Sequence, residues 1–285
     1  MKLIIISGLS GSGKTVALHT LEDEGFYCVD NLPLGLLPGF TEQLTSQQLQ
    51  IYDQIAVGID ARSGANDLRR FSQIINTLKK TDIEIEVVYF QADIKELIKR
   101  FSDTRRRHPL TRKGMPLAEA IDIERNLLSP VAHDADLCLD TTNTNVHQLR
   151  AIIKERIISR PNHGLSILIQ SFGFKHSVPT DSDFVFDVRC LPNPHWEPRL
   201  RPLTGQDPEV QAFFKDQEDV IDMYSHIRNF LEYWIPKFAE QNRYYLTASI
   251  GCTGGQHRSV YIAELLNKYL SEKFPSVSLR HREME

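Results

Sequence analysis

The chain has 285 residues, of which 41% are hydrophobic and 25% are charged, and its net charge is −4. This composition is typical of a globular protein with a sizeable core and excludes a disordered or fibrous chain. Neither half is basic, so a nucleic-acid partner requires a local patch of positive charge. Four widely spaced cysteines argue against a disulfide framework or a zinc ribbon. No apolar run is long enough for a signal peptide or a membrane span, so we expect a cytoplasmic protein.

The first half of the chain alternates short apolar runs with segments of helical periodicity. The apolar runs predict strands at 3–7, 26–30, 55–60, 86–92 and 136–140. The periodic segments predict helices at 13–24, 66–80, 94–104, 116–128 and 145–159. Nearly continuous apolar strands separated by helices are typical of a parallel sheet that helices cover on both faces. We therefore expect an α/β domain over residues 1–158.

A second set of elements follows the segment RPNHG (160–164), which resembles a linker. Strands are predicted at 165–173, 183–189 and 245–252, and helices within 208–240 and at 259–273. Apolar residues at helical spacing in 208–240 are expected to be core residues. The prediction is a smaller C-terminal α/β domain over residues 159–285.

The stretch GLSGSGKT stands between the first predicted strand and the first predicted helix and matches G-x-x-x-x-G-K-[ST] in full. Glycines let the backbone wrap with its N–H groups inward, and the helix N-terminus adds partial positive charge. This pattern indicates a P-loop NTPase domain of kinase-like type that binds a nucleoside triphosphate. The expected ATP-binding residues are Gly8, Leu9, Ser10, Gly11, Ser12, Gly13, Lys14 and Thr15. Lys14 is expected on the β/γ-phosphates and Thr15 on Mg²⁺.

Magnesium bound to a nucleotide also needs a carboxylate, usually at the end of a neighbouring strand. Asp60 is the first candidate and Asp30 the second; an aspartate after a strand is also a common turn or cap residue. We therefore predict Lys14 and Asp60 as the catalytic residues. Weaker candidates are Asp93 and Asp140.

Residues 95–113 carry eight Lys+Arg against two acids and form the most basic stretch of the chain. Three interpretations stay open. The stretch is a solvated helix face, a set of contacts to RNA phosphates, or an arginine lid over a transferring phosphate. The lid would use Arg100, Arg105 and Arg106.

The stretch GCTGGQHRS (251–259) repeats the strand, glycine-rich turn and helix of the first loop. We expect it to bind an anion, since backbone N–H groups and an arginine suffice for this. Cys252 and Arg258 also spell C-x5-R, the pattern of a cysteine phosphatase, although Gly251 stands where such loops carry a histidine. The Pro-rich segment 187–202, with His195, joins the loop in a predicted second pocket for a small anion.

Several long motifs resemble the RapZ/YvcJ family of bacterial nucleotide-binding proteins across essentially the whole chain. They are SGLSGSGKTVALHTLEDEGFYCVDNLP, DTRRRHPL, QSFGFKHSVP, DVRCLPNPHW and IGCTGGQHRSVYIAE. The resemblance implies binding of ATP at the first loop, binding of GTP at a D-x-R-[NS] motif, and weak ATPase and GTPase activity. The GTP motif falls on Asp60, Ala61, Arg62 and Ser63.

Enterobacterial members of that family imply a regulatory role for the second domain. In those members, this domain binds small regulatory RNA and glucosamine-6-phosphate and presents an RNA to a ribonuclease. The resemblance therefore implies an RNA-binding adapter and a homo-oligomer. The matching sugar-phosphate residues are His195, Thr253, Gly254 and Arg258. Two departures weaken the RNA expectation: the chain ends in LRHREME rather than a basic tail, and Gln256 stands where a lysine is common. The alternatives are a P-loop small-molecule kinase and a cysteine phosphatase.

Overall fold

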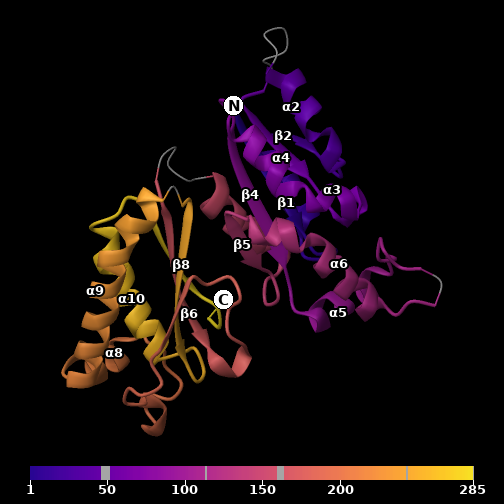
Figure 1. Cartoon of the computed structure of the whole chain (residues 1–285). Helices are drawn as coiled ribbons and strands as arrows, with labels where there is room; N and C mark the ends of the chain where they lie inside the picture. Colours follow the sequence, from indigo (N-terminus) through magenta and orange to yellow (C-terminus); the bar gives the residue numbers. More distant parts are fainter. Residues whose placement is uncertain (46–51, 113, 159–163, 242, 285) are drawn as a thin grey trace. The chain divides into compact units, whose positions relative to one another are not determined.

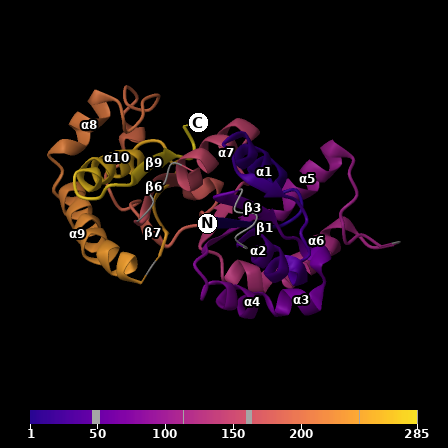
Figure 2. The ribbon, with the colours of Figure 1, turned by 90° about the horizontal axis from the view of Figure 1, so that it is seen from above.

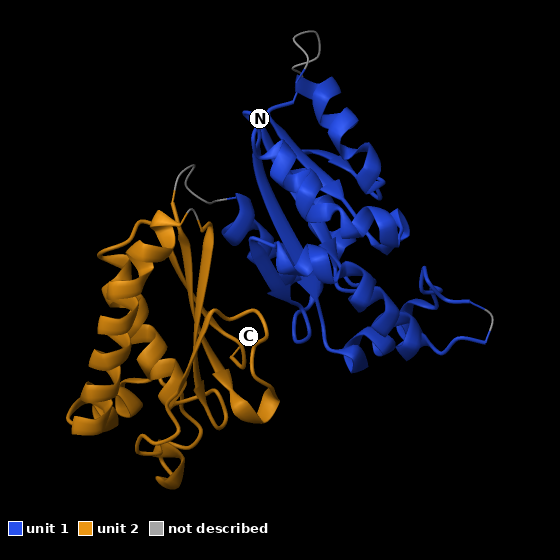
Figure 3. Cartoon of the chain, in the orientation of Figure 1, with its two compact units in different colours: residues 1–159 blue, residues 160–285 orange. Residues whose placement is uncertain are grey.

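A computed structural model describes residues 1–45, 52–112, 114–158, 164–241 and 243–284. The chain divides into two compact units, Met1–Ser159 and Arg160–Glu285 (Figure 3). Of the segment 160–164, which the sequence suggests as a linker, residues 160–163 lie outside the described ranges.

The first unit is built on a five-stranded sheet in which every pairing is parallel. The strand order is β2-β3-β1-β4-β5, so β1 occupies the centre. Leu3, Ile4, Ile5 and Ile6 of β1 are fully buried, as the uninterrupted apolar run requires for a strand covered on both faces. The strands are β1 (Lys2–Gly8), β2 (Tyr27–Val29), β3 (Gln54–Gly58), β4 (Glu84–Gln91) and β5 (Leu137–Asp140).

Helices cover both faces of this sheet (Figure 2). One face carries α1 (Lys14–Asp23) and α7 (Val146–Ile153), and the opposite face carries α3 (Ala65–Arg69), α4 (Phe71–Leu78) and α6 (Leu117–His133). The predicted fold class is confirmed. Two further helices are α2 (Leu37–Thr45), which the sequence analysis did not predict, and α5 (Ile94–Thr104).

The predicted helix over 66–80 is wrong in its continuity, because Arg70 separates α3 from α4. Its backbone has φ −94° and ψ 3°, and its N–H bonds to the carbonyl of Asp67, three residues back. The change to this tighter hydrogen bond ends one helix and redirects the next.

The second unit contains a four-stranded parallel sheet with the order β7-β8-β6-β9. Its helices α8 (Pro208–Lys215), α9 (Glu218–Glu240) and α10 (Arg258–Ser271) lie on one side of it (Figure 1). This confirms the predicted smaller α/β domain, with one strand more than the sequence suggests. The strands are β6 (Ser166–Gly173), β7 (Phe184–Asp187), β8 (Tyr245–Cys252) and β9 (Val277–His281).

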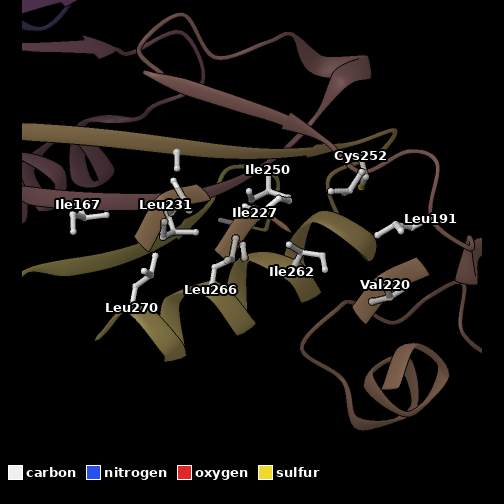
Figure 4. Close-up of a cluster of buried hydrophobic side chains, with 14 of the residues drawn as sticks. Ile167, Leu191, Val220, Ile227, Leu231, Ile250, Cys252, Ile262, Leu266 and Leu270 are labelled. Atoms are coloured by element: carbon white, nitrogen blue, oxygen red, sulfur yellow. The ribbon is translucent and has the colours of Figure 1, made fainter. Parts of the chain in front are cut away.

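The core of the second unit lies between this sheet and α9 and α10 (Figure 4). Ile250 of β8 packs in one cluster with Ile227 and Leu231 of α9 and with Ile262 and Leu266 of α10. The expectation that the apolar residues within 208–240 are core residues is confirmed for Val210, Phe214, Ile227 and Leu231 but is wrong for Ile221, Phe230 and Trp234, which are exposed. In the described ranges, no helix is long and apolar enough to cross a membrane.

Candidate functional site: two glycine-rich loops

The first loop joins the central strand β1 to α1 and can be built only with glycine at its start. Gly8 has φ +135°, and a Cβ atom there would lie 2.6 Å from the backbone nitrogen of Phe90 and would overlap its carbonyl oxygen. The helix begins after Gly13, and within the described chain no side chain caps its first turn. Its free N–H groups and the helix dipole are therefore available to an anion.

Lys14, the first residue of α1, folds back over the loop. Its Nζ donates to the carbonyl of Gly8 at 2.6 Å and to that of Leu9 at 3.0 Å. Burial lowers the pKa of the ammonium, while the carboxylates of Glu124, Asp60 and Asp30 act against this. The lysine is therefore a half-buried cation held by carbonyl oxygens, next to the groups predicted to meet phosphate.

Asp60 follows β3 and caps the short turn Ala61–Ser63. Its carboxylate accepts from the Arg62 backbone N–H at 2.9 Å and from Arg62 Nε at 2.8 Å. The hydrogen bond to Asp60 raises the pKa of Arg62 further. Arg62 also donates to the side chain of Asn31, so the predicted GTP motif is an ordered, paired turn beside the loop. Ala61 is buried, and Ser63 Oγ accepts from the Leu34 backbone at 3.4 Å.

The residues here fit a magnesium ion that arrives with a nucleotide. Thr15 is exposed on the first turn of α1, and Asp30 and Asp60 both act electrostatically on Lys14. Across the described chain, no group of three or more His, Cys, Asp or Glu side chains could hold a metal ion. Mg²⁺ prefers one or two protein oxygens together with phosphate and water, which matches this sparse set of ligands.

Glu124 of α6 lies against the loop, a contact the sequence analysis missed. It is fully buried and accepts from the N–H of Ser10 at 2.8 Å and from its hydroxyl at 2.6 Å. His108, 3% exposed, lies with Nε2 3.1 Å from the same carboxylate. No local spacing links residues 114 positions apart, so the sequence carries no signal for this contact.

Arg100 hydrogen-bonds to the backbone of the loop, whereas the lid interpretation expects it to close over a phosphate. Its Nη1 donates to the carbonyl of Gly11 at 3.1 Å and to Thr141 Oγ1 at 3.0 Å. Its Nη2 donates to the Thr141 carbonyl at 2.5 Å. Arg105 and Arg106 are exposed after α5.

The second loop joins β8 to α10 and encloses the guanidinium of Arg258, which is 6% exposed. Nη1 donates to the carbonyls of Arg189 at 2.7 Å and Leu191 at 3.2 Å, and Nη2 donates to Thr253 Oγ1 at 3.3 Å. Among the described residues, its buried Nε has no hydrogen-bond partner. Arg258 therefore joins the loop to the segment after β7 through three of its five N–H groups.

The other predicted sugar-phosphate residues lie around this arginine. Thr253 is exposed, Gly254 is half-buried, and His195 is exposed on the short turn Pro194–Trp196. Burial lowers the pKa of the neighbouring His257, and the charges of His195 and Arg258 lower it further. The structure thus brings Thr253 and Arg258 into contact, with His195 on the adjoining turn.

Cys252 is a core residue, which disfavours the phosphatase alternative. It is 3% exposed and packs in the hydrophobic cluster of the second unit (Figure 4). Its sulfur accepts the N–H of Gly255 at 3.3 Å and lies 3.1 Å from Ser259 Oγ. Reactive cysteines lie in partly exposed sites, whereas a buried thiol with such contacts shapes the loop.

The end of the chain places a carboxylate on this second loop. Gly255 has φ +76°, and a Cβ atom there would overlap the Glu283 carboxylate. The segment is fixed by His281, whose Nδ1 lies 2.8 Å from Ser171 Oγ and whose Nε2 lies 3.1 Å from Glu264. Burial raises the pKa of Glu283 to about 6 despite a hydrogen bond from the Gly173 backbone. Glu283 thus adds a carboxylate at the loop, and Arg282 and Arg280 from the same segment act on it with positive charge.

A parallel α/β unit whose central strand leads through G-x-x-x-x-G-K-T into a helix defines a P-loop domain. The chain belongs to the RapZ-like family. The family model of the RapZ-like N-terminal domain matches residues 1–160, and that of the RapZ C-terminal domain matches residues 165–285.

Curated relatives match the chain over its full length. A nucleotide-binding protein of Thioalkalivibrio sulfidiphilus is 55% identical, and the alignment covers 100% of both chains. A nucleotide-binding protein of Methylococcus capsulatus is 52% identical over 100% of this chain and 96% of its own length. One from Pseudomonas putida is 50% identical over 100% of both chains.

Among solved structures, the chain is similar to shikimate kinase from Acinetobacter baumannii in complex with shikimate. That match has 18% identity and a TM-score of 0.36 and covers 55% of this chain and 93% of the kinase. A gluconokinase from Sinorhizobium meliloti matches with 13% identity and a TM-score of 0.33, over 53% of this chain and 89% of the kinase.

Proposed function

We propose that this protein binds ATP and GTP through its first glycine-rich loop and hydrolyses them slowly. The observation that carries the proposal is the loop itself. Gly8 has a backbone conformation that other residues rarely adopt, no described side chain caps the start of α1, and Lys14 donates to the loop backbone. Such a loop binds phosphate oxygens through main-chain N–H groups. The proposed binding residues are those of the loop, Gly8–Thr15, and of the GTP motif, Asp60–Ser63. The curated relatives carry the name nucleotide-binding protein, which supports the same proposal.

In this proposal, Mg²⁺ accompanies the nucleotide and is held by Thr15 and Asp60. When bound, the ion neutralises charge on the phosphate oxygens. Lys14 leaves the carbonyls of Gly8 and Leu9 and donates to the phosphates instead. Asp60 keeps its bonds to Arg62: Oδ2 faces the guanidinium, whereas Oδ1 accepts one backbone N–H and retains acceptor capacity for the ion or its waters.

The second unit, we propose, is the regulatory half of a cytosolic adapter. Its loop binds a sugar phosphate such as glucosamine-6-phosphate through Thr253, Gly254 and Arg258, with His195 on the adjoining turn. Membership of the RapZ-like family and the free Nε of Arg258 support this role. A small regulatory RNA is the proposed macromolecular partner, which a homo-oligomer of this protein presents to a ribonuclease.

Replacement of Lys14 tests the nucleotide site. Lys14→Ala removes the cation that meets the phosphates, and ATP affinity measured by calorimetry should fall at least about tenfold. The exposed Lys80→Ala variant, at the end of α4, changes the charge equally and should bind like the unmodified protein. Equal ATP affinity of Lys14→Ala and the unmodified protein would contradict the proposal. Transfer of labelled phosphate from ATP to a metabolite would instead support the kinase alternative.

Filter binding tests the adapter role. Small regulatory RNA should bind at low salt, with affinity that falls as salt rises because phosphate contacts release counterions. Addition of glucosamine-6-phosphate should change that affinity. Absence of RNA binding at low salt would remove the adapter role and leave the nucleotide site unaffected.

A further inference from the structure

We infer that Glu124 is a positioning residue of the nucleotide loop and that His108 holds Glu124 in place. The inference rests on the proposed nucleotide site. Its basis is a chain of short contacts between fully or almost fully buried groups, which begins at Ser10 in the loop and passes through Glu124 of α6 to His108.

The hydrogen bonds define the protonation of this chain. The Leu110 backbone N–H donates to His108 Nδ1 at 3.2 Å, so Nδ1 is the acceptor and Nε2 carries the proton. Nε2 therefore donates to Glu124 Oε2 at 3.1 Å, in addition to the N–H and O–H of Ser10. A carboxyl group that receives three donors is ionised. Burial would raise the pKa of Glu124, but the His108 and Ser10 bonds and the Lys14 charge bring it below its ordinary value.

This geometry gives Glu124 two effects on the loop. It fixes both polar groups of one loop residue, Ser10, so that the backbone on either side keeps its shape without a ligand. It also places a buried negative charge near Lys14, whose ammonium would otherwise be costly to bury. A loop held in its binding shape loses less entropy when phosphate arrives.

His108 connects the loop to the basic segment that follows α5. Arg105, Arg106 and Arg107 immediately before it are exposed, whereas the histidine ring is buried against Phe101 with 5.3 Å between ring centroids. The histidine is therefore the inward anchor of an otherwise exposed basic stretch, and its only described acidic partner is the carboxylate that holds Ser10.

The test compares variants that keep shape and change only a donor or a charge. Glu124→Gln keeps the size but removes the negative charge. The amide oxygen can accept from the Ser10 N–H and His108 while the NH₂ donates to the Ser10 hydroxyl, so three charge-assisted hydrogen bonds become weaker neutral ones. ATP affinity should fall about tenfold. The amides of residues 8–15 should also exchange with deuterium faster, because the hydrogen bonds that hold Ser10 are weaker. Glu119→Gln, an exposed glutamate on the same helix, should change neither result.

A pair of replacements at His108 separates positioning from packing. His108→Phe keeps the ring against Phe101 but removes the N–H, whereas His108→Gln restores an N–H at the position of Nε2. We expect His108→Phe to bind ATP about fivefold to tenfold more weakly and His108→Gln to recover most of the loss. These variants also serve if Glu124→Gln does not fold.

Equal ATP affinity and loop exchange in Glu124→Gln and the unmodified protein would overturn the inference. So would His108→Phe binding like His108→Gln. Failure of the unmodified protein to bind ATP would instead overturn the proposed function, so the two failures are distinguishable.

Discussion

Gly8 and Glu124 both shape the first loop, Gly8 through its backbone conformation and Glu124 through its hydrogen bonds to Ser10. The glycines, Lys14 and Thr15 follow from a local spacing, because the chemistry of a strand–helix turn lies within eight consecutive residues. The contact of Glu124 with Ser10 depends on how α6 packs, which no local pattern encodes. The contacts of Arg100 also depend on packing. The basic run 95–113 suggests a lid, whereas packing directs the Arg100 guanidinium to the carbonyls of Gly11 and Thr141.

Glu283 makes a prediction about pH. Burial raises its pKa in the folded protein to about 6, from 4.5 in the unfolded chain. The folded state therefore binds this proton more tightly, and the ionised carboxylate costs stability above about pH 6 but not below pH 4.5. Glu283→Gln should raise the urea midpoint at pH 7.5 relative to the unmodified protein, and the difference should vanish at pH 4. Glu272→Gln, an exposed control on the neighbouring helix end, should show no such pH-dependent difference. A Glu283→Gln difference of equal size at both pH values would contradict the argument.

Helices and strands could be predicted where the apolar periodicity was strong, and their prediction failed where it was weak. The strands β1 to β8 follow their apolar runs to within a few residues. The strand β9 escaped because its residues, VSLRH, are all only partly buried and read as a polar tail. The helical spacing within 208–240 did not show where one helix ends and the next begins: Asp216 ends α8 with φ −106° and ψ 12°, and α9 starts at Glu218.

The helix α9 supplies a matched test of how its buried face stabilises the second unit. Ile227 is 2% exposed in the core, whereas Ile221 on the same helix is 49% exposed. Ile227→Ala leaves a cavity and should cost about 2–5 kcal/mol of unfolding free energy. Ile221→Ala should cost at most about 1 kcal/mol, because its side chain already contacts water. Urea denaturation measures both, and equal losses would show that α9 does not pack as described.

At the scale of the whole molecule, each unit has a parallel sheet, its own buried cluster and one glycine-rich loop. Alternation of strands and helices made this division visible in the sequence. The ligands were less predictable, because anion-binding loops share backbone chemistry and differ in the side chains around them. The first loop is bordered by Lys14 and by the carboxylates that act on it, the second by Arg258 and the carboxylate of Glu283.

The nucleotide site should function without the second unit. The described side-chain contacts to the first loop come from residues within 1–158, and β1 is buried on both faces in this unit. A fragment of residues 1–158 should therefore fold and bind ATP with an affinity within about twofold of the full chain, since it retains each of these contacts. Calorimetry on both proteins measures this, and the fragment with Lys14→Ala supplies the non-binding control. A folded fragment that binds ATP more than tenfold weaker would show that residues beyond 158 contribute to the site.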